Sequence, residues 1–342
     1  MAIRALLVVL SFVVQLAYAD DEVSRESLLD YEPGAGKTST VIDIAGHDVP
    51  VVTGGLYHRY RSNPPLEVIA QQAPDTDLSW FNTLTKTEVD IGFTSWSPNF
   101  YYDNSRISVI YTADLDRLRA LMPEAILERV QPLSIWPGRG LIVLTAYAYH
   151  HCDNDRYNEL AISIVTNKPG STNLGPLTLA GQALGKDFWG YVLKLPVNTE
   201  LARVRGVVGY NLPKWLTRID YKDTGSELRF EIGDGEGGTE LVLEGAKLDA
   251  VSTEDSVVRN SFTNLGSNGE LEFGYADSRQ LRHGSSSDSA DVSLQLGGGE
   301  LSEFIQSLKL GKMIRYEYVP EFQSALYAPQ PLAALLGEEG GH

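Results

Sequence analysis

One lysine stands in a largely apolar segment that is punctuated by glycines. Residues 204–219 read VRGVVGYNLPKWLTRI, and Lys214 lies between Pro213 and Trp215. If this side chain points inward, loss of hydration disfavours its ammonium form. A neutral amine is a nucleophile for carbonyl carbons, which is the chemistry of Schiff-base formation. The alternative is an edge position, in which the lysine stem lies on Trp215 and the ammonium group stays in water.

Other patterns that could carry chemistry are incomplete. Residues 34–38 (GAGKT) end like a phosphate-binding loop, but Tyr31 stands where that motif needs its first glycine. Residues 150–155 (HHCDND) contain metal-ligating types, yet adjacent histidines on a strand point to opposite faces. The Gly-x-Ser-x-Gly turn of serine hydrolases is absent. We therefore predict no metal site and no cofactor.

The lysine segment resembles the signature of the acetoacetate decarboxylase family. That signature is a short glycine-rich stretch ending in Pro-Lys-Lys, and its first lysine forms the Schiff base. The positions that match are Gly206, Gly209, Tyr210, Pro213 and Lys214. Three further stretches resemble the family in the same order along residues 90–325: residues 109–125 (VIYTADLDRLRALMPEA), residues 157–159 (YNE) and residues 300–318.

The resemblance implies roles for five residues. Lys214 would be the Schiff-base nucleophile, and Glu159 would position the substrate or move protons. Arg106 lies two residues beyond the family's arginine. A shift of two keeps the strand face, so Arg106 would hold the substrate's carboxylate. Tyr210 and Trp215 would line the cavity. The alternatives are a solvated strand-end carboxylate for Glu159 and a surface position for Arg106.

The departures from the family bear on the substrate. Trp215 replaces the second lysine, so desolvation alone must suppress the charge on Lys214, and Leu144 and Thr145 stand where the family places a glutamate. These changes imply a larger, less charged keto compound. The predicted function is a lyase that decarboxylates a β-keto acid or related keto compound, in secondary metabolism. The alternatives are an aldolase or dehydratase that uses the same lysine, and a non-catalytic binder of an apolar small molecule. The family also implies a homo-oligomer.

The elements that must position these residues are mostly short strands. Residues 106–112 are β-branched and aromatic, residues 141–151 and 160–166 read as a strand pair, and residues 215–221 and 228–232 read as a hairpin. Helical spacing is confined to short stretches such as residues 114–122 and 300–310. This pattern predicts an α+β chain, mostly antiparallel β, with a closed or partly closed β-barrel and a few short helices.

Four regions are expected along the chain. Residues 1–19 resemble a secretory signal peptide, with Arg4, an apolar run and the cleavage pattern Ala17-Tyr18-Ala19. Residues 20–89 form an N-terminal arm packed on the main domain and include an edge strand over residues 41–52 that carries Pro50. The main domain spans residues 90–330, its residues 284–290 form a flexible loop, and residues 331–342 form a flexible tail.

The composition of the chain limits the classes of molecule that it is expected to bind. With 45 acidic against 28 basic residues the net charge is −17, which argues against nucleic acid and anionic lipid as partners. The expected partner is a small keto acid or ketone. Cys152 is the single cysteine, so no intramolecular disulfide can form, and a buried, inert thiol is favoured over a reactive one. The signal peptide predicts a location outside the cell or in the secretory lumen.

Overall fold

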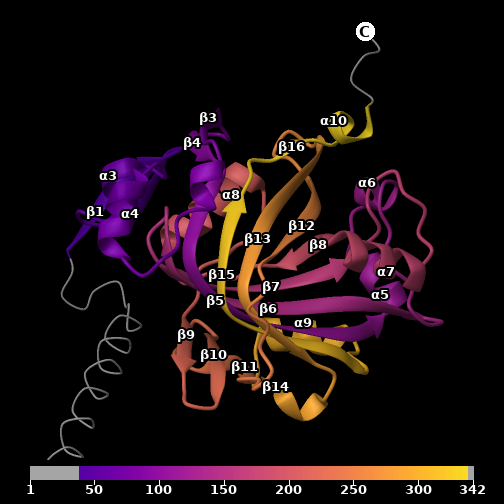
Figure 1. Cartoon of the computed structure of the whole chain (residues 1–342). Coiled ribbons are helices and arrows are strands. Elements are labelled where there is room, and N and C mark those ends of the chain that lie inside the picture. The colour runs from indigo at the N-terminus through magenta and orange to yellow at the C-terminus, as the bar shows by residue number, and fades with distance from the viewer. Residues whose placement is uncertain (1–37, 338–342) are drawn as a thin grey trace, which may run out of the picture. The chain divides into compact units, whose positions relative to one another are not determined.

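Seven strands form a closed barrel. The computed structural model describes residues 38–337, so the predicted signal peptide lies outside the described residues. Neighbouring barrel strands are antiparallel except for β12 and β8, which are parallel, and the pairing of β12 with β13 closes the sheet (Figure 1). The predicted fold class is confirmed. In order around the barrel the strands are β12 (Ser256–Leu265), β8 (Asp187–Lys194), β7 (Tyr157–Val165), β6 (Arg139–Cys152), β5 (Asn99–Asp114), β15 (Met313–Leu326) and β13 (Leu271–Ser286).

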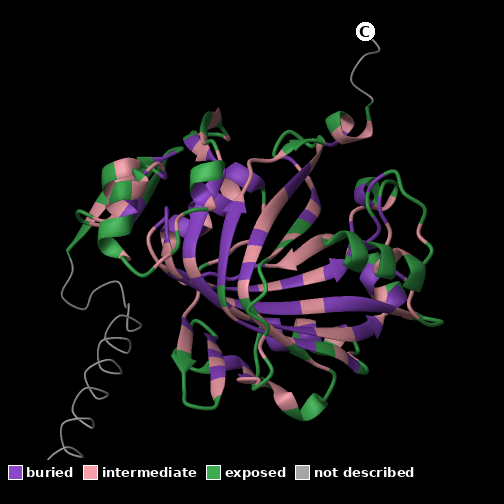
Figure 2. Cartoon of the chain, viewed as in Figure 1, coloured by how far each residue is buried: buried purple, intermediate pink, exposed green. Residues whose placement is uncertain are grey.

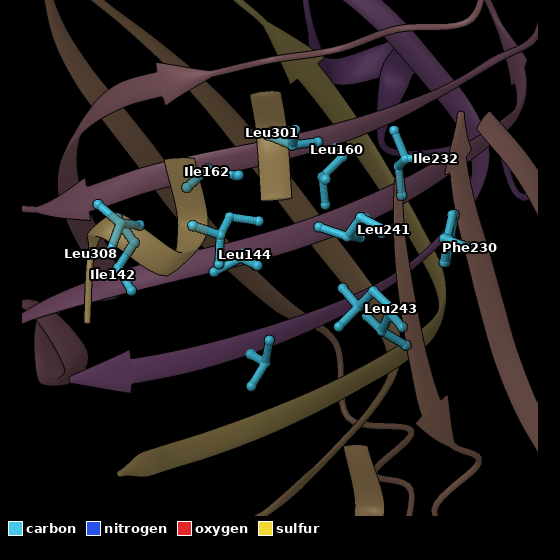
Figure 3. Packing of buried hydrophobic residues seen from close by; sticks show 14 of the residues in the cluster. Ile142, Leu144, Leu160, Ile162, Phe230, Ile232, Leu241, Leu243, Leu301 and Leu308 are labelled. Carbon is cyan, nitrogen blue, oxygen red and sulfur yellow. The ribbon is translucent and has the colours of Figure 1, made fainter. Parts of the chain in front are cut away.

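A second, four-stranded sheet covers part of the barrel's outer wall. Its order is β14 (Val292–Leu296), β11 (Thr239–Ala246), β10 (Glu227–Gly233) and β9 (Ile219–Asp223). Figure 3 shows leucines and isoleucines of β6 and β7 facing Phe230, Leu241 and Leu243 of this sheet. The helices α5 (Leu115–Ala120), α6 (Glu124–Leu127) and α9 (Glu300–Ser307) complete the same core. The predicted hairpin is confirmed, although its first strand β9 begins at Ile219 and not at Trp215, and the helices near residues 115 and 300 are confirmed.

Strand alternation separates the barrel's two faces. On β6, Ile142, Leu144 and Ala146 pack into the core shared with the outer sheet. Because successive side chains point to opposite faces, Thr145, Tyr147 and Tyr149 point into the barrel. The predicted pairing of β6 with β7 is confirmed, and its register places Tyr147 opposite Glu159. The register therefore assigns Glu159 to the inner face.

The N-terminal arm is more regular than the sequence indicated. The predicted single strand over residues 41–52 is wrong: the segment forms a hairpin of β1 (Ser39–Ile44) and β2 (His47–Val52), because Ala45 and Gly46 take the positive φ that a tight turn needs. The arm continues through α3 (Leu56–Tyr60), α4 (Leu66–Gln72), a 3-10 turn (Phe81–Thr83), β3 (Thr87–Asp90) and β4 (Thr94–Ser97). Phe81 packs with Phe100 and Tyr102 of β5.

Two segments expected to be flexible contain regular structure over part of their length, and residues 338–342 of the expected tail lie outside the described residues. Residues 332–336 of the predicted tail form α10 (Leu332–Leu336), because Leu332 buries itself against Trp189 and Phe273. The predicted loop at residues 284–290 begins as the last residues of β13, which pair with β15. The rest of the described chain adds β16 (Gln330–Pro331) and the helices α7 (Pro176–Gly185) and α8 (Glu200–Tyr210).

Burial follows this architecture. Figure 2 shows β5, β6, β7 and β15 largely buried and β8, β12 and β13 mostly intermediate, while turns and loops carry most of the exposed residues. Cys152 is buried, as predicted, and burial raises the pKa of its thiol well above the ordinary value. Over residues 38–337 no helix is long and apolar enough to cross a membrane.

The core between the two sheets predicts a large cost for truncation. Leu243→Ala should lower the free energy of unfolding by about 2–5 kcal/mol, since it removes fully buried methyl groups and leaves a cavity. Leu184→Ala is the matched control, because that leucine is 87% exposed on α7, and it should change stability by less than about 0.5 kcal/mol. Urea unfolding measures both. Equal losses would contradict the described packing.

Candidate active site

Helix α8 and the turn after it place Lys214. Thr199 caps the helix by accepting a hydrogen bond from the Ala202 amide, and Asn211 ends it in the left-handed conformation that asparagine tolerates. Pro213 cannot continue the helix, so the chain leaves it extended. Backbone hydrogen bonds then tie residues 213–217 to residues 195–197, beside β7. Lys214 is therefore held on an ordered, extended segment.

The lysine meets the predicted glutamate inside the barrel. Lys214 Nζ lies 2.6 Å from Glu159 Oε2, and each side chain is only 8% exposed. Lys214 Nζ also lies 5.6 Å from the centre of the Tyr157 ring. Two charges at this burial lose most of their hydration, so the pair depends on mutual contact and on further hydrogen bonds. The alternative in which Lys214 lies at a sheet edge is contradicted, because its ammonium group is buried and not in water.

Glycine 206 makes the space for the lysine stem. A Cβ on this residue would lie 2.3 Å from Lys214 Cδ and 2.5 Å from Lys214 Cε, closer than any real Cβ contact. Gly206 also accepts a hydrogen bond from the Leu212 amide, which fixes the turn that leads to the lysine. The glycine that matched the family signature is thus required here by close approach of the lysine side chain.

Tyrosines surround the carboxylate side of the pair. Tyr149 donates a hydrogen bond to Glu159 Oε1 at 3.1 Å, so both carboxylate oxygens are occupied. The hydroxyls of Tyr101 and Tyr157 lie 3.1 Å apart, and both rings pack against Tyr149. Burial raises the pKa of Tyr149 and of Tyr157 well above the usual range, so both hydroxyls stay protonated as donors. No sequence pattern indicates Tyr149 or Tyr101 as site residues, and strand alternation from Glu159 indicates Tyr157 alone.

Arg106 shares the inner face but is already paired. Arg106 is on β5 and pairs with Tyr147 of β6, which in turn pairs with Glu159 of β7. One strand therefore separates Arg106 from Glu159. Its guanidinium donates to Ser108 at 2.5 Å and to Glu317 at 3.4 Å. Glu317 therefore offsets its charge, and the same guanidinium holds the pKa of Glu317 below its ordinary value against the effect of burial. The structure places Arg106 on the site's face with an acidic partner of its own.

The two predicted wall residues differ in position. Tyr210 ends α8, is buried, and has its pKa raised to about 12 by burial. Trp215 follows Lys214 in extended chain and so points the opposite way, where it packs against the core shared with the outer sheet and near Lys194. The structure does not bring Trp215 to the lysine, and we leave it out of the site.

A second buried lysine serves a different purpose. Lys86 donates to Asp153 at 2.5 Å and to the Ser62 carbonyl at 2.8 Å. Asp153 also accepts from the Phe100 amide and from the Tyr102 hydroxyl, so it is held from three sides. Burial lowers the pKa of Lys86 and raises that of Asp153. Sequence gave no signal for this pair, which joins the arm to the barrel.

The lysine–glutamate pair is enclosed. A surface depression lined by residues that include Lys247, Asp249, Arg282 and Tyr318 shares no residue with it. The structure thus combines a closed, mostly antiparallel barrel with a buried ion pair on its inner face.

Comparison with known proteins gives structural likeness only. No family model and no curated protein matches this chain. Among solved structures, the chain is similar to an acetoacetate decarboxylase, with 14% identity and a TM-score of 0.47 over 68% of this chain and 88% of that one. It is also similar to the enduracididine biosynthesis enzyme MppR complexed with pyruvate, with 13% identity and a TM-score of 0.48 over 69% and 91% of the two chains. An acetoacetate decarboxylase from Legionella pneumophila matches at 11% identity with a TM-score of 0.48, over 68% and 86%.

The close approach at Gly206 predicts an effect on stability. Gly206→Ala should lower the free energy of unfolding by about 1–3 kcal/mol, because the new methyl group overlaps the lysine stem. Gly181→Ala on α7 is the control: nothing lies within 4 Å of its Cβ, and alanine should stabilise the helix by about 0.5–1 kcal/mol. Opposite signs in urea unfolding are expected, and a stabilising Gly206→Ala would disprove the contact.

A double-mutant cycle tests whether the two charges depend on each other. Glu159→Gln should cost about 3–5 kcal/mol of stability, since it leaves a buried ammonium group without its partner. Adding Lys214→Met should recover part of that loss, with a coupling energy of about 0.5–3 kcal/mol. Chemical denaturation of the four proteins gives the value. Strictly additive losses would mean that the side chains do not interact.

Proposed function

We propose that this protein is a Schiff-base enzyme that decarboxylates a β-keto acid through Lys214. The observation that carries the proposal is the 2.6 Å contact between Lys214 Nζ and Glu159 Oε2 on the enclosed inner face of the barrel. An amine nucleophile beside a carboxyl group that can exchange protons with it is what imine formation requires. The residues that match the family signature around Lys214 support the same chemistry.

Imine formation uses both members of the pair. Transfer of one proton from Lys214 Nζ to Glu159 leaves a neutral amine, whose lone pair forms a bond to the ketone carbon. The ketone oxygen takes up the proton and gives a carbinolamine. A second proton, delivered through Glu159, lets that oxygen leave as water, and the product is a protonated imine. Tyr149 keeps the carboxylate aimed at the nitrogen through its hydrogen bond to Oε1.

The imine then accepts the electrons of the bond that breaks. The positively charged nitrogen withdraws the pair of the bond between the α-carbon and the carboxylate, carbon dioxide leaves, and an enamine forms. The α-carbon takes a proton, and water hydrolyses the resulting imine to release the ketone and the free lysine. Glu159, which exchanges protons with Lys214 during imine formation, supplies and takes up these protons, while Tyr149 stays protonated and holds the carboxylate through its hydrogen bond.

Reductive trapping tests the nucleophile. Incubation with acetoacetate or pyruvate followed by borohydride should add the mass of the reduced ketone at Lys214, and Lys214→Met should give no adduct. Lys194→Met is the matched control, because Lys194 lies near Trp215 outside the barrel and should leave the adduct unchanged. Glu159→Gln should slow trapping by about a hundredfold, in the range of general acid–base effects.

Product analysis distinguishes the alternatives. Without borohydride, release of carbon dioxide from a β-keto acid supports decarboxylation, whereas a condensation or dehydration product from the same imine identifies an aldolase or dehydratase. A folded protein that forms no adduct with any member of a ketone panel would refute the enzyme proposal and favour a non-catalytic binder.

A further inference from the structure

Helix α8 carries a buried arginine that has no acidic partner. Arg205 is 4% exposed and forms no ion pair with any residue in the described part of the chain. Its hydrogen bonds go to three neutral groups: the Tyr57 hydroxyl at 3.2 Å, Ser95 Oγ at 3.2 Å and Asn99 Oδ1 at 3.3 Å. Burying a guanidinium without a counter-charge is costly, so its persistence calls for a physical reason.

Two N–H donors at this place have no acceptor. Arg205 Nε and Asn99 Nδ2 are both fully buried and form no hydrogen bond among the described residues. They belong to side chains that already contact each other through Asn99 Oδ1, so the unused donors lie in one neighbourhood. Buried donors are satisfied in the great majority of cases, and these two donors are free to bind an acceptor.

Aromatic rings cover the guanidinium group of Arg205 but do not accept hydrogen bonds from its N–H groups. Arg205 lies 5.1 Å from the centre of the Tyr57 ring and 5.3 Å from that of Phe93. Such contacts use the ring faces and offset part of the charge. They accept none of the in-plane N–H bonds of Arg205 and offer nothing to Asn99.

One carboxylate that could neutralise Arg205 is otherwise engaged. Asp153 belongs to the same region, but Lys86, Phe100 and Tyr102 already hold it. The positive charge of Arg205 acts on neighbouring groups. It favours the ionised forms of Cys152 and Tyr210, and so it opposes the rise in pKa that burial causes in both. Arg205 also directly precedes Gly206, against which the stem of Lys214 lies.

We propose that Arg205 and Asn99 form a binding site for a small carboxylate. The carboxylate oxygens would accept from Arg205 Nε and Asn99 Nδ2, a charge-assisted arrangement of the strong kind. Four elements meet here: α3 with Tyr57, β4 with Ser95, β5 with Asn99 and α8 with Arg205. The claim that this carboxylate belongs to the substrate rests on the proposed function. The claim that the site binds a carboxylate does not depend on that function.

Thermal denaturation tests binding without covalent chemistry. In the Lys214→Met protein, sodium acetate and sodium pyruvate should raise the Tm in a saturable way, compared with sodium chloride at the same ionic strength. Adding Arg205→Met should weaken the apparent Kd at least about tenfold, as for loss of a hydrogen bond to a charged group. Arg203→Met is the control on the same helix, since Arg203 pairs with Glu200 and should not change the response. An unchanged Kd in Arg205→Met, or an equal rise with chloride, would overturn the proposal.

A second variant tests the proposal even if Arg205→Met does not fold. Asn99→Asp places a resident carboxylate beside Arg205, so it should raise the Tm without ligand and abolish the response to acetate. A full acetate response in this variant would also overturn the proposal.

Trapping at Lys214 then identifies the source of the carboxylate. If the group is the substrate's own, Arg205→Met should lower the yield with subsaturating pyruvate about tenfold but leave the yield with methyl pyruvate unchanged. If both yields are unchanged while the Tm response is lost, the site binds a separate carboxylate. A retained Tm response in Lys214→Met, with no adduct in the unaltered protein, would leave the anion site standing and refute the proposed function.

Discussion

The arrangement of this barrel depends on a buried ion pair between Lys214 and Glu159. Desolvation of an isolated ammonium or carboxylate is costly, so each of these two groups depends on its contact with the other on the inner face. Three elements of the barrel and its surroundings hold the pair together. Strand β7 carries the glutamate, Tyr149 on β6 occupies its second oxygen, and the missing side chain of Gly206 lets the lysine stem pass α8.

The division of the sheet into two faces makes such a pair compatible with folding. The outward side chains of β6 and β7 form an apolar core with the second sheet, and that core is the largest hydrophobic cluster among the described residues. The inward side chains are then free to be polar, aromatic or charged. The same logic explains the arm: its contacts with α8 and β5 hold the end of the barrel where Lys214 enters.

Much of this could be predicted from local sequence, and the failures have physical causes. Strand pairs and short helices follow from side-chain alternation and caps, as for β6 with β7 and for Asp114 at the start of α5. Lys214 stood out because it interrupts an apolar segment. Its contact with Glu159, 55 residues away, depends on the register of β7 and on the path after α8, which no local pattern contains. Trp215 was misplaced because neighbouring side chains of an extended segment point to opposite sides, so Trp215 faces away from the inward-pointing Lys214. Arg205 was overlooked because only its tertiary neighbours reveal that it lacks a counter-charge.

A crystal structure of the protein soaked with a keto acid would test the central claim most directly. We predict continuous electron density from Lys214 Nζ to the former carbonyl carbon, with the Glu159 carboxylate still within hydrogen-bonding distance of that nitrogen. Lys214 found in its contact with Glu159 at saturating ligand, with the keto acid bound elsewhere or not at all, would contradict the account.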